Sequence, residues 1–215
     1  MSVRENRSGR QTKEWILDTA CRLFNEHGTA AISTKRIAKE MGISPGNLYY
    51  HFKNKEDIIL ALFQANKDAF IDELADQKVP PLQRFCDVTR GVVMMWQDCR
   101  FLKKEMVMLI DTDPRLKRGY YDMADAIRQK AGVLLQDLME AGLLDTQKFS
   151  PETFESLLNI SILVANHWLS HLDMTGLDVS MENLQKGAEL ILLVWRPYLT
   201  DNALAQLAQH QKHDP

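Results

Sequence analysis

The chain has little cysteine. Its 215 residues include three, Cys21, Cys86 and Cys99, and they contain no CxxC pair. An odd number of cysteines argues against a disulfide framework and is typical of a reducing compartment, so we expect small buried apolar residues at these positions. A redox or ligand role for Cys86 or Cys99 is the alternative.

Long apolar runs are also missing. The most apolar stretch, residues 154–172, contains polar residues where a membrane span would be unbroken, and no charged-then-apolar leader opens the chain. We therefore expect a cytoplasmic protein without a membrane partner. The interrupting residues are Glu155, Asn159, Asn166, His167 and His171.

Signatures of catalysis are absent as well. The sequence has no GxSxG, Walker or HExxH motif, and no cysteine with a plausible base nearby in a motif. We expect no enzyme, no cofactor and no metal. His167 and His171 are four residues apart, but no Glu or Cys stands at a matching spacing, so a polar interface or pocket role is favoured over zinc.

The apolar pattern has helical periods throughout, and no alternating strand pattern is present, which predicts an all-α fold. Apolar residues are 45% of the chain, enough for a substantial core. The first helix is expected from Thr12 to Gly28. Asn54 is the expected N-cap of a later helix, and Pro80 and Pro81 break the chain after it. Further helices are predicted at 82–98, 101–111, 115–141, 151–172, 181–199 and 202–211.

Charge is divided unevenly along the chain. The net charge of −3 combines +5 over residues 1–55, from ten Lys and Arg against five Asp and Glu, with −8 over the remainder. A basic N-terminal part on an acidic body is what an anion-binding module would show, although this asymmetry alone points only weakly to nucleic acid.

Two short helices with the same start signal follow the first helix. Ser33 and Ser44 are expected N-caps, and Ile37 and Leu48 stand at the fourth helical position, where an apolar residue before the cap can contact them. Gly42 stops the first of the two, leaving a three-residue link. Short apolar helices joined by such a link are typical of a helix-turn-helix.

The second of these helices has the composition of a helix that reads DNA in the major groove. Leu48 and Phe52 share one face and anchor it, while the N-terminal amides after Ser44 offer partial positive charge to an anion. The exposed sides would carry Gly46, Asn47, Tyr49, Tyr50 and His51, and the flanking cations are Lys35, Arg36, Lys53 and Lys55.

The segment from Thr12 to about Leu62 resembles the N-terminal domain of the TetR/AcrR family of bacterial regulators. The similarity lies in the run STKRIAKEMGISPGNLYYHFKNKEDII, which begins at Ser33. The resemblance implies that Thr34 and Lys35 meet the DNA backbone or a neighbouring base. It places Gly46, Asn47 and Tyr49 against bases, and Tyr50, His51 and Lys55 against phosphates.

Alternative roles remain for the aromatic residues of this segment. Tyr49 or Tyr50 packs against the first helix in one alternative, and His51 acts as a local cap in another.

The resemblance also implies a domain plan. Residues 12–55 are expected as the DNA-binding domain and 56–215 as a helical domain for ligand binding and dimerisation. Residues 1–11 are polar and have no apolar period, so their composition predicts a disordered basic arm. The last two long helices, Pro151 to Leu172 and Met181 to Leu199, would form the homodimer interface as a four-helix arrangement between two chains.

Methionine and aromatic side chains are concentrated in the middle helices, and such residues suit an apolar pocket that adjusts its shape to a ligand. The alternative is an ordinary core, which such a stripe forms more often. The pocket candidates are Met94, Met95, Trp96, Phe101, Met106, Met123 and His167.

These features together predict a dimeric repressor that binds a palindromic operator in double-stranded DNA and is released by a small-molecule effector. The alternative is an architectural or activating DNA-binding protein without an effector.

Overall fold

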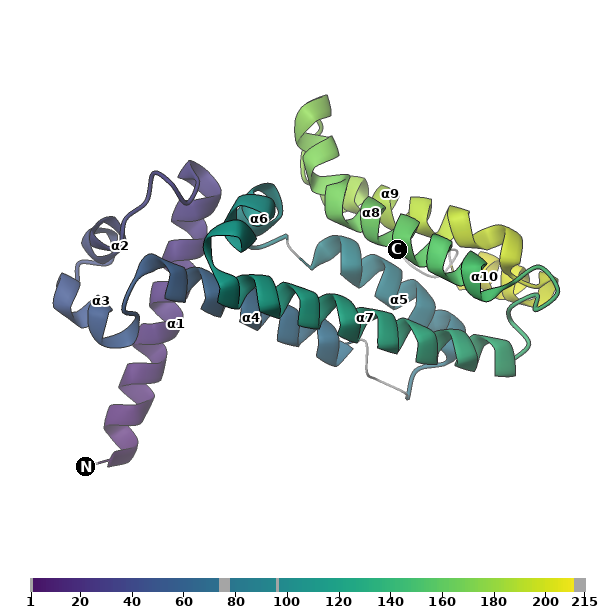
Figure 1. Ribbon diagram of the computed structural model, residues 1–215, viewed down its shortest axis with the longest axis horizontal. Coiled ribbons are helices and arrows are strands. Elements are labelled where there is room, and N and C mark those ends of the chain that lie inside the picture. The colour runs from purple at the N-terminus through teal and green to yellow at the C-terminus, as the bar shows by residue number, and fades with distance from the viewer. Residues whose placement is uncertain (1, 74–77, 96, 211–215) are drawn as a thin grey trace. The chain divides into compact units, whose positions relative to one another are not determined.

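The computed structural model describes residues 2–73, 78–95 and 97–210 (Figure 1). Over these ranges the chain forms helices and no strand, apart from one isolated bridge between Leu144 and Leu199, so the all-α prediction is confirmed. None of the described helices is long and apolar enough to cross a membrane. The helices are α1 (Ser2–His27), α2 (Thr34–Glu40), α3 (Pro45–His51), α4 (Lys55–Glu73), α5 (Pro81–Met94), α6 (Arg100–Thr112), α7 (Pro114–Glu140), α8 (Pro151–Thr175), α9 (Met181–Trp195), the 3₁₀ turn η1 (Arg196–Tyr198) and α10 (Asp201–His210).

The helix starts follow local capping chemistry. The Ser33 and Ser44 hydroxyls accept hydrogen bonds from the Arg36 and Asn47 amides, each at 3.2 Å, and the Asn54 side chain accepts one from the Asp57 amide at 2.8 Å. Each cap satisfies an amide that the helix itself leaves without a partner. These predicted caps are confirmed. Gly42, after α2, has φ +65°, a backbone conformation that glycine adopts without a steric cost.

Helix α1 begins ten residues earlier than the sequence indicates, because the structure describes residues 2–11, expected as a disordered arm, as helical. Extending an existing helix adds about one backbone hydrogen bond for each residue that is ordered, which is far easier than starting a new helix. Arg10 adds an ion pair with Glu14, one turn along the same helix, at 3.1 Å.

The chain forms two compact units, residues 1–67 with 96–120 and residues 68–95 with 121–215. The first unit therefore contains α6 and the start of α7 besides α1 to α3 and most of α4. The predicted functional boundary between residues 55 and 56 stays a prediction.

The core of the first unit is built from the apolar faces of α1 to α4 and α6. Phe24 on α1 packs against Phe101 on α6 with ring centroids 5.0 Å apart, and both side chains are buried. Gly119 on α7 lies against Phe63 on α4, where an added Cβ would be 3.1 Å from the ring. Helix α6 is thus part of the unit that holds the helix-turn-helix.

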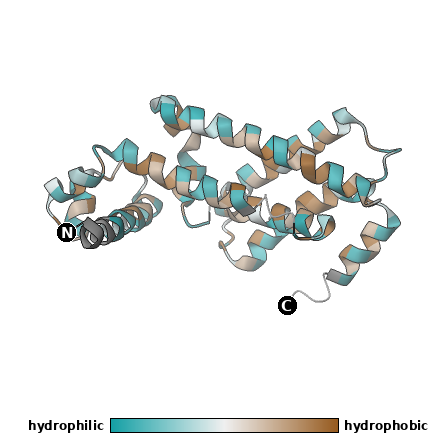
Figure 2. Ribbon diagram, turned by 90° about the horizontal axis from the view of Figure 1, so that it is seen from below, coloured by the Kyte–Doolittle hydropathy of each residue, from teal (hydrophilic) through white to brown (hydrophobic). Residues whose placement is uncertain are grey.

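In the second unit, α9 packs against both α5 and α8. Trp195 on α9 meets Phe85 on α5 with ring centroids 5.3 Å apart, and Phe149 stacks on the same indole at 6.1 Å. Arg84 on α5 is buried and forms an ion pair with Asp137 on α7. Figure 2 shows apolar and hydrophilic residues sharing each helix, as expected for elements that are buried on one side.

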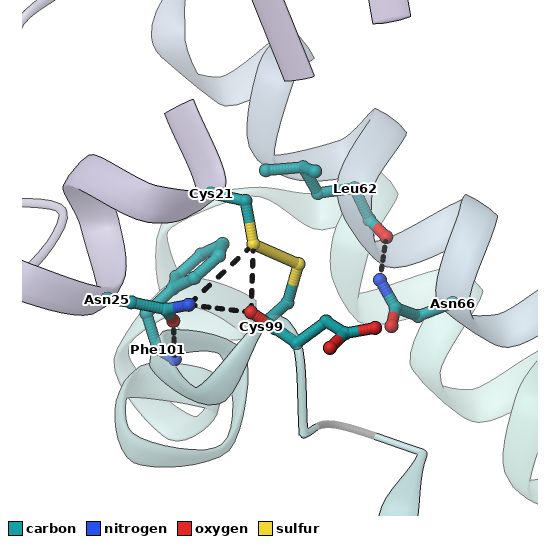
Figure 3. Close-up of a disulfide and its surroundings, with 7 residues drawn as sticks. Cys21, Asn25, Leu62, Asn66, Cys99 and Phe101 are labelled. Atoms are coloured by element: carbon teal, nitrogen blue, oxygen red, sulfur yellow. Dashed lines mark hydrogen bonds between the residues drawn. A yellow bond between two sulfur atoms is a disulfide. The ribbon is translucent and has the colours of Figure 1, made fainter. Parts of the chain in front are cut away.

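Cys21 on α1 and Cys99, just before α6, form a disulfide with a Cα–Cα distance of 5.8 Å (Figure 3). The expectation of three cysteines without a disulfide is therefore wrong, although Cys21 and Cys99 are buried as expected. The pair is separated by 78 positions, and only the packing of α6 on α1 brings the two sulfurs together. The parity of the cysteine count carried no information about this contact.

Candidate nucleic-acid interface

Helix α3 is held from beneath by two apolar side chains. Leu48 is fully buried and Phe52 is nearly so, as the sequence indicates. The Lys13 ammonium lies 5.5 Å from the centre of the Phe52 ring, so α1 supports the same anchor through a cation–π contact. The opposite side of α3 is exposed.

The predicted reading residues do lie on that open side. Gly46 and Asn47 are exposed, and an added Cβ on Gly46 would meet only the Ser44 hydroxyl, at 3.9 Å. Tyr50 is 85% exposed, which excludes the alternative that it packs against α1. His51 contacts the Tyr50 ring edge-on, at 5.1 Å between centroids.

Tyr49 links the two helices of the motif. Its hydroxyl lies 3.2 Å from the Thr34 hydroxyl at the start of α2, and 45% of the residue remains exposed. Both residues line a hollow of about 330 Å³ that also includes Lys53 and Lys55. Sequence reasoning did not identify the other walls of this hollow, Ala30, Ala31, Ile32, Ser33 and Asn54, because nothing in their residue types indicates a recess.

Lys55 is placed differently from Lys53. Its ammonium donates a hydrogen bond to the Thr29 carbonyl at 2.6 Å, while the Thr29 amide donates to the Glu105 carboxylate at 3.1 Å. The Thr29 hydroxyl donates to the same carboxylate. Lys55 therefore helps to hold the turn between α1 and α2, and its phosphate contact stays a prediction.

Positive charge surrounds the open side of α3. Lys35, Arg36 and Lys53 are exposed, and in the described ranges no acidic side chain lies within ion-pair distance of them. Arg22, by contrast, pairs with Glu40 on α2 at 2.7 Å, and the hydrogen bonds that it donates to Glu40 and Glu26 raise the pKa of its guanidinium. Lys35, Arg36 and Lys53 therefore differ from Arg22 in having no carboxylate partner among the described residues.

The predicted pocket residues are divided between the two units. Phe101 and Met106 belong to the core of the first unit, whereas Met123 is buried in the second and His167 is exposed on α8. Met94 and Met95 are half-buried at the end of α5, and Trp96 lies outside the described residues.

The second unit contains a cavity of about 80 Å³ between α5, α7, α8 and α9, also lined by Phe70 at the end of α4. None of the predicted pocket residues lines it. Its polar groups are few: Lys130, Thr89 and Ser161, whose hydroxyl accepts a hydrogen bond from the Trp195 indole at 3.0 Å. The walls are otherwise apolar, including Phe85, Leu134, Leu138, Phe154 and Ile191.

The outer face of α8 and α9 carries large apolar side chains in contact with solvent. Leu163 is 58% exposed and Leu193 is 60% exposed, with Ile160 and Leu190 close to 40%. A single exposed leucine needs no explanation, but exposed apolar side chains on two packed helices are a feature of association surfaces.

Two family models match the chain. One, described as bacterial regulatory proteins of the tetR family, matches residues 16–62, and the other, a TetR model described as a bacterial transcriptional repressor, matches residues 62–207. An HTH-type transcriptional regulator of Staphylococcus aureus (strain USA300) is 42% identical over 65 residues, which are 30% of this chain. The match spans about a third, 35%, of that relative's length.

Solved structures resemble the chain over nearly its full length. A TetR-family transcriptional regulator from Marinobacter aquaeolei VT8 has a TM-score of 0.81 and 29% identity, covering 95% of this chain and 99% of that one. The SmeT–triclosan complex has a TM-score of 0.67 and 20% identity, with coverage of 90% and 94%. The second likeness concerns the fold alone.

Proposed function

This chain belongs to the TetR family of bacterial transcriptional regulators, and from that premise we propose that it is a repressor that binds a palindromic operator as a homodimer and leaves it when a small molecule binds. The observation that supports this proposal most is the open side of α3, where polar groups stand on a buried apolar anchor with exposed cations beside them. Such a helix suits the major groove.

Within this site, Asn47 is proposed to read bases and Lys35 to contact a phosphate. Asn47→Ala should cost about 1 to 3 kcal/mol per half-site and relax the preference at one base pair, since an asparagine pairs with an adenine edge in a bidentate manner. Lys35→Ala should weaken binding to operator and random DNA alike. It should lower the log–log salt slope by about 1.8 for two copies per dimer.

Selection of bound duplexes from a random library supplies the operator for these measurements. A palindrome with two half-sites is the expected result. Equal binding to all duplexes would instead favour the alternative, an architectural DNA-binding protein. If Asn47→Ala left the base preference unaltered, the placement of α3 in the major groove would be wrong.

The exposed leucines of α8 and α9 support the homodimer. Leu193→Asp would place a charge in the proposed four-helix interface, and we expect a monomer by sedimentation at micromolar concentration. Val133→Asp is the matched control, because Val133 is 48% exposed on α7, outside α8 and α9. A monomeric parent protein, or equal effects of the two variants, would contradict this interface.

The cavity of the second unit is the proposed effector site. Its volume of about 80 Å³ is roughly half that of a cavity that accepts benzene, so a larger ligand enters only if the surrounding helices separate. A ligand that binds only the separated state shifts the protein toward it. We propose an apolar or amphipathic molecule whose polar group meets Lys130, Thr89 or Ser161.

Triclosan is a suitable first probe, because SmeT, which shares the fold, binds it. Binding should lower the affinity for the operator, and the operator should lower the affinity for triclosan by the same factor. Ala131→Phe, which fills the cavity from α7, should abolish triclosan binding and leave DNA binding in place. Triclosan binding that survives Ala131→Phe would place the effector elsewhere.

A further inference from the structure

Cys21 and Cys99 join α1 to the start of α6 in the first unit, and neither residue lines the proposed effector cavity. Cys21 lies on α1, which packs against α2, and Cys99 is the residue before α6. Their Cα–Cα distance of 5.8 Å is within the usual range for a disulfide. Cys86, the third cysteine, lies on α5 and is not part of the bond.

The surroundings of the pair suit the thiol form as well as the disulfide. Cys21 Sγ lies 3.2 Å from the Asp98 carbonyl oxygen, a contact that becomes a hydrogen bond only when the sulfur carries a proton. The Asn25 amide donates to the same carbonyl at 2.6 Å, a hydrogen bond that does not depend on a sulfur (Figure 3). Both redox states therefore have partners at this site.

Asn25 also holds the start of α6. Its side-chain oxygen accepts a hydrogen bond from the Phe101 amide at 3.0 Å, whereas Cys99, at the N-cap position, makes no side-chain cap hydrogen bond. The hydrogen bonds of Asn25 and the disulfide thus tie the same end of α6 to α1 (Figure 3).

Further along α6, Glu105 binds the amide and hydroxyl of Thr29 in the turn that leads from α1 to α2. Lys55 binds the carbonyl of the same residue at 2.6 Å. The position of α6 on α1 consequently determines how firmly this turn, directly before the helix-turn-helix, is held.

We propose that Cys21 and Cys99 form a reversible thiol–disulfide switch, and that the disulfide form binds the operator more tightly than the dithiol form. The disulfide orders α6 against α1 before DNA binds, so each helix-turn-helix loses less conformational freedom when it binds the operator. The inference rests on DNA binding by the helix-turn-helix and is independent of effector release.

A small disulfide is the oxidant in this scheme. Cys21 is the more exposed of the two residues, at 8%, and its thiolate attacks one sulfur of the small disulfide and releases one small thiol. The Cys99 thiolate then attacks Cys21 in the mixed disulfide and releases the second. Two protein thiols are oxidised by two electrons, one small disulfide is reduced to two thiols, and the two protons leave on these products.

The test uses the full-length protein after treatment with dithiothreitol or with oxidised glutathione. Maleimide labelling under denaturing conditions with mass spectrometry should count three reactive thiols in the first sample and one, Cys86, in the second. Failure of the two cysteines to interconvert between these states would overturn the switch, whatever the DNA measurements show.

Operator affinity is then measured in both states by fluorescence anisotropy. We expect reduction to weaken operator binding about tenfold, because the helix-turn-helix of both subunits loses order. Binding to a random duplex should change much less. Cys99→Ser should remove the response to oxidant, and Cys86→Ser, the matched control, should retain it. Equal affinity in the two states, tighter binding after reduction, or a response that survives Cys99→Ser would refute the proposal.

The reduced and oxidised states are compared in the parent protein, so a folding defect of Cys99→Ser would not affect the result. Circular dichroism of the reduced parent protein should show unchanged helicity. A loss of helix on reduction would mean that unfolding, rather than a switch, explains the weaker binding, and would also overturn the proposal.

Discussion

Gly187 on α9 offers a sharp test of the packing in the second unit. A Cβ at this position would lie 2.6 Å from Trp168 Cδ1 and 2.8 Å from Trp168 Cγ, so the indole would have to move. The indole is held by a hydrogen bond to the Asn183 carbonyl at 2.7 Å and by stacking on His171. Gly187→Ala therefore sets a helix-propensity gain against a packing loss.

The magnitudes favour the loss. Alanine gains about 1 kcal/mol over glycine inside a helix. Overpacking costs about 1 to 3 kcal/mol, and displacing the indole adds about 1 kcal/mol for its hydrogen bond. We expect Gly187→Ala to lower the free energy of unfolding by about 1 to 3 kcal/mol, which corresponds to about 2 to 12 °C in Tm for a chain of this size.

Gly132 on α7 is the matched control. It also lies inside a helix, but a Cβ there would meet nothing within 4 Å. Gly132→Ala should therefore stabilise the protein by up to about 1 kcal/mol. Urea unfolding at one fixed protein concentration measures both variants, because dissociation of a dimer makes stability depend on concentration. If both substitutions changed stability in the same direction, the close contact at Trp168 would be refuted.

Three further outcomes follow from the structure. Asp137→Ala should lower the free energy of unfolding by about 3 kcal/mol, because it leaves the buried guanidinium of Arg84 without its carboxylate; a loss within experimental error in urea unfolding would refute this. Hydrogen bonds from Arg115 lower the pKa of Asp113, so their contribution is complete above the unfolded value of about 4 and is lost as the pH falls through the folded value. Arg115→Gln should flatten this acid limb in unfolding titrations, and an unchanged limb would contradict the assignment. Reduction of the Cys21–Cys99 disulfide, which closes a loop across 78 positions, should cost at most about 4.5 kcal/mol of stability by chain entropy, and an increase in Tm after reduction would be inconsistent with this.

The helix-turn-helix could be predicted from the sequence because its helix ends depend on interactions between neighbouring residues. Ser33 and Ser44 cap helices because their hydroxyls reach an amide three residues ahead, and Gly42 ends α2 because it adopts a positive φ. These interactions span a few residues, so the order of residues determines them. The burial of Leu48 and the exposure of Tyr50 follow from the helical period in the same way.

The predicted pocket residues show what an argument from composition does not distinguish. A cluster of methionines and aromatics along the chain does not distinguish the core of the first unit, where Phe101 lies, from the walls of a cavity in the second. The cavity walls come instead from four helices and the end of a fifth, and residues such as Ala131 carry no signal of their own.

By itself, the sequence determined the all-α fold, the capped helix pair and the apolar anchor of α3, because each depends on periods and contacts within a few residues. Tertiary structure alone decided that Cys21 meets Cys99, that Lys55 and Glu105 both hold Thr29, and that Trp168 lies against Gly187. These contacts join segments that are separated in the sequence. They exist because close packing of whole helices sets which side chains face one another, and no local pattern encodes that choice.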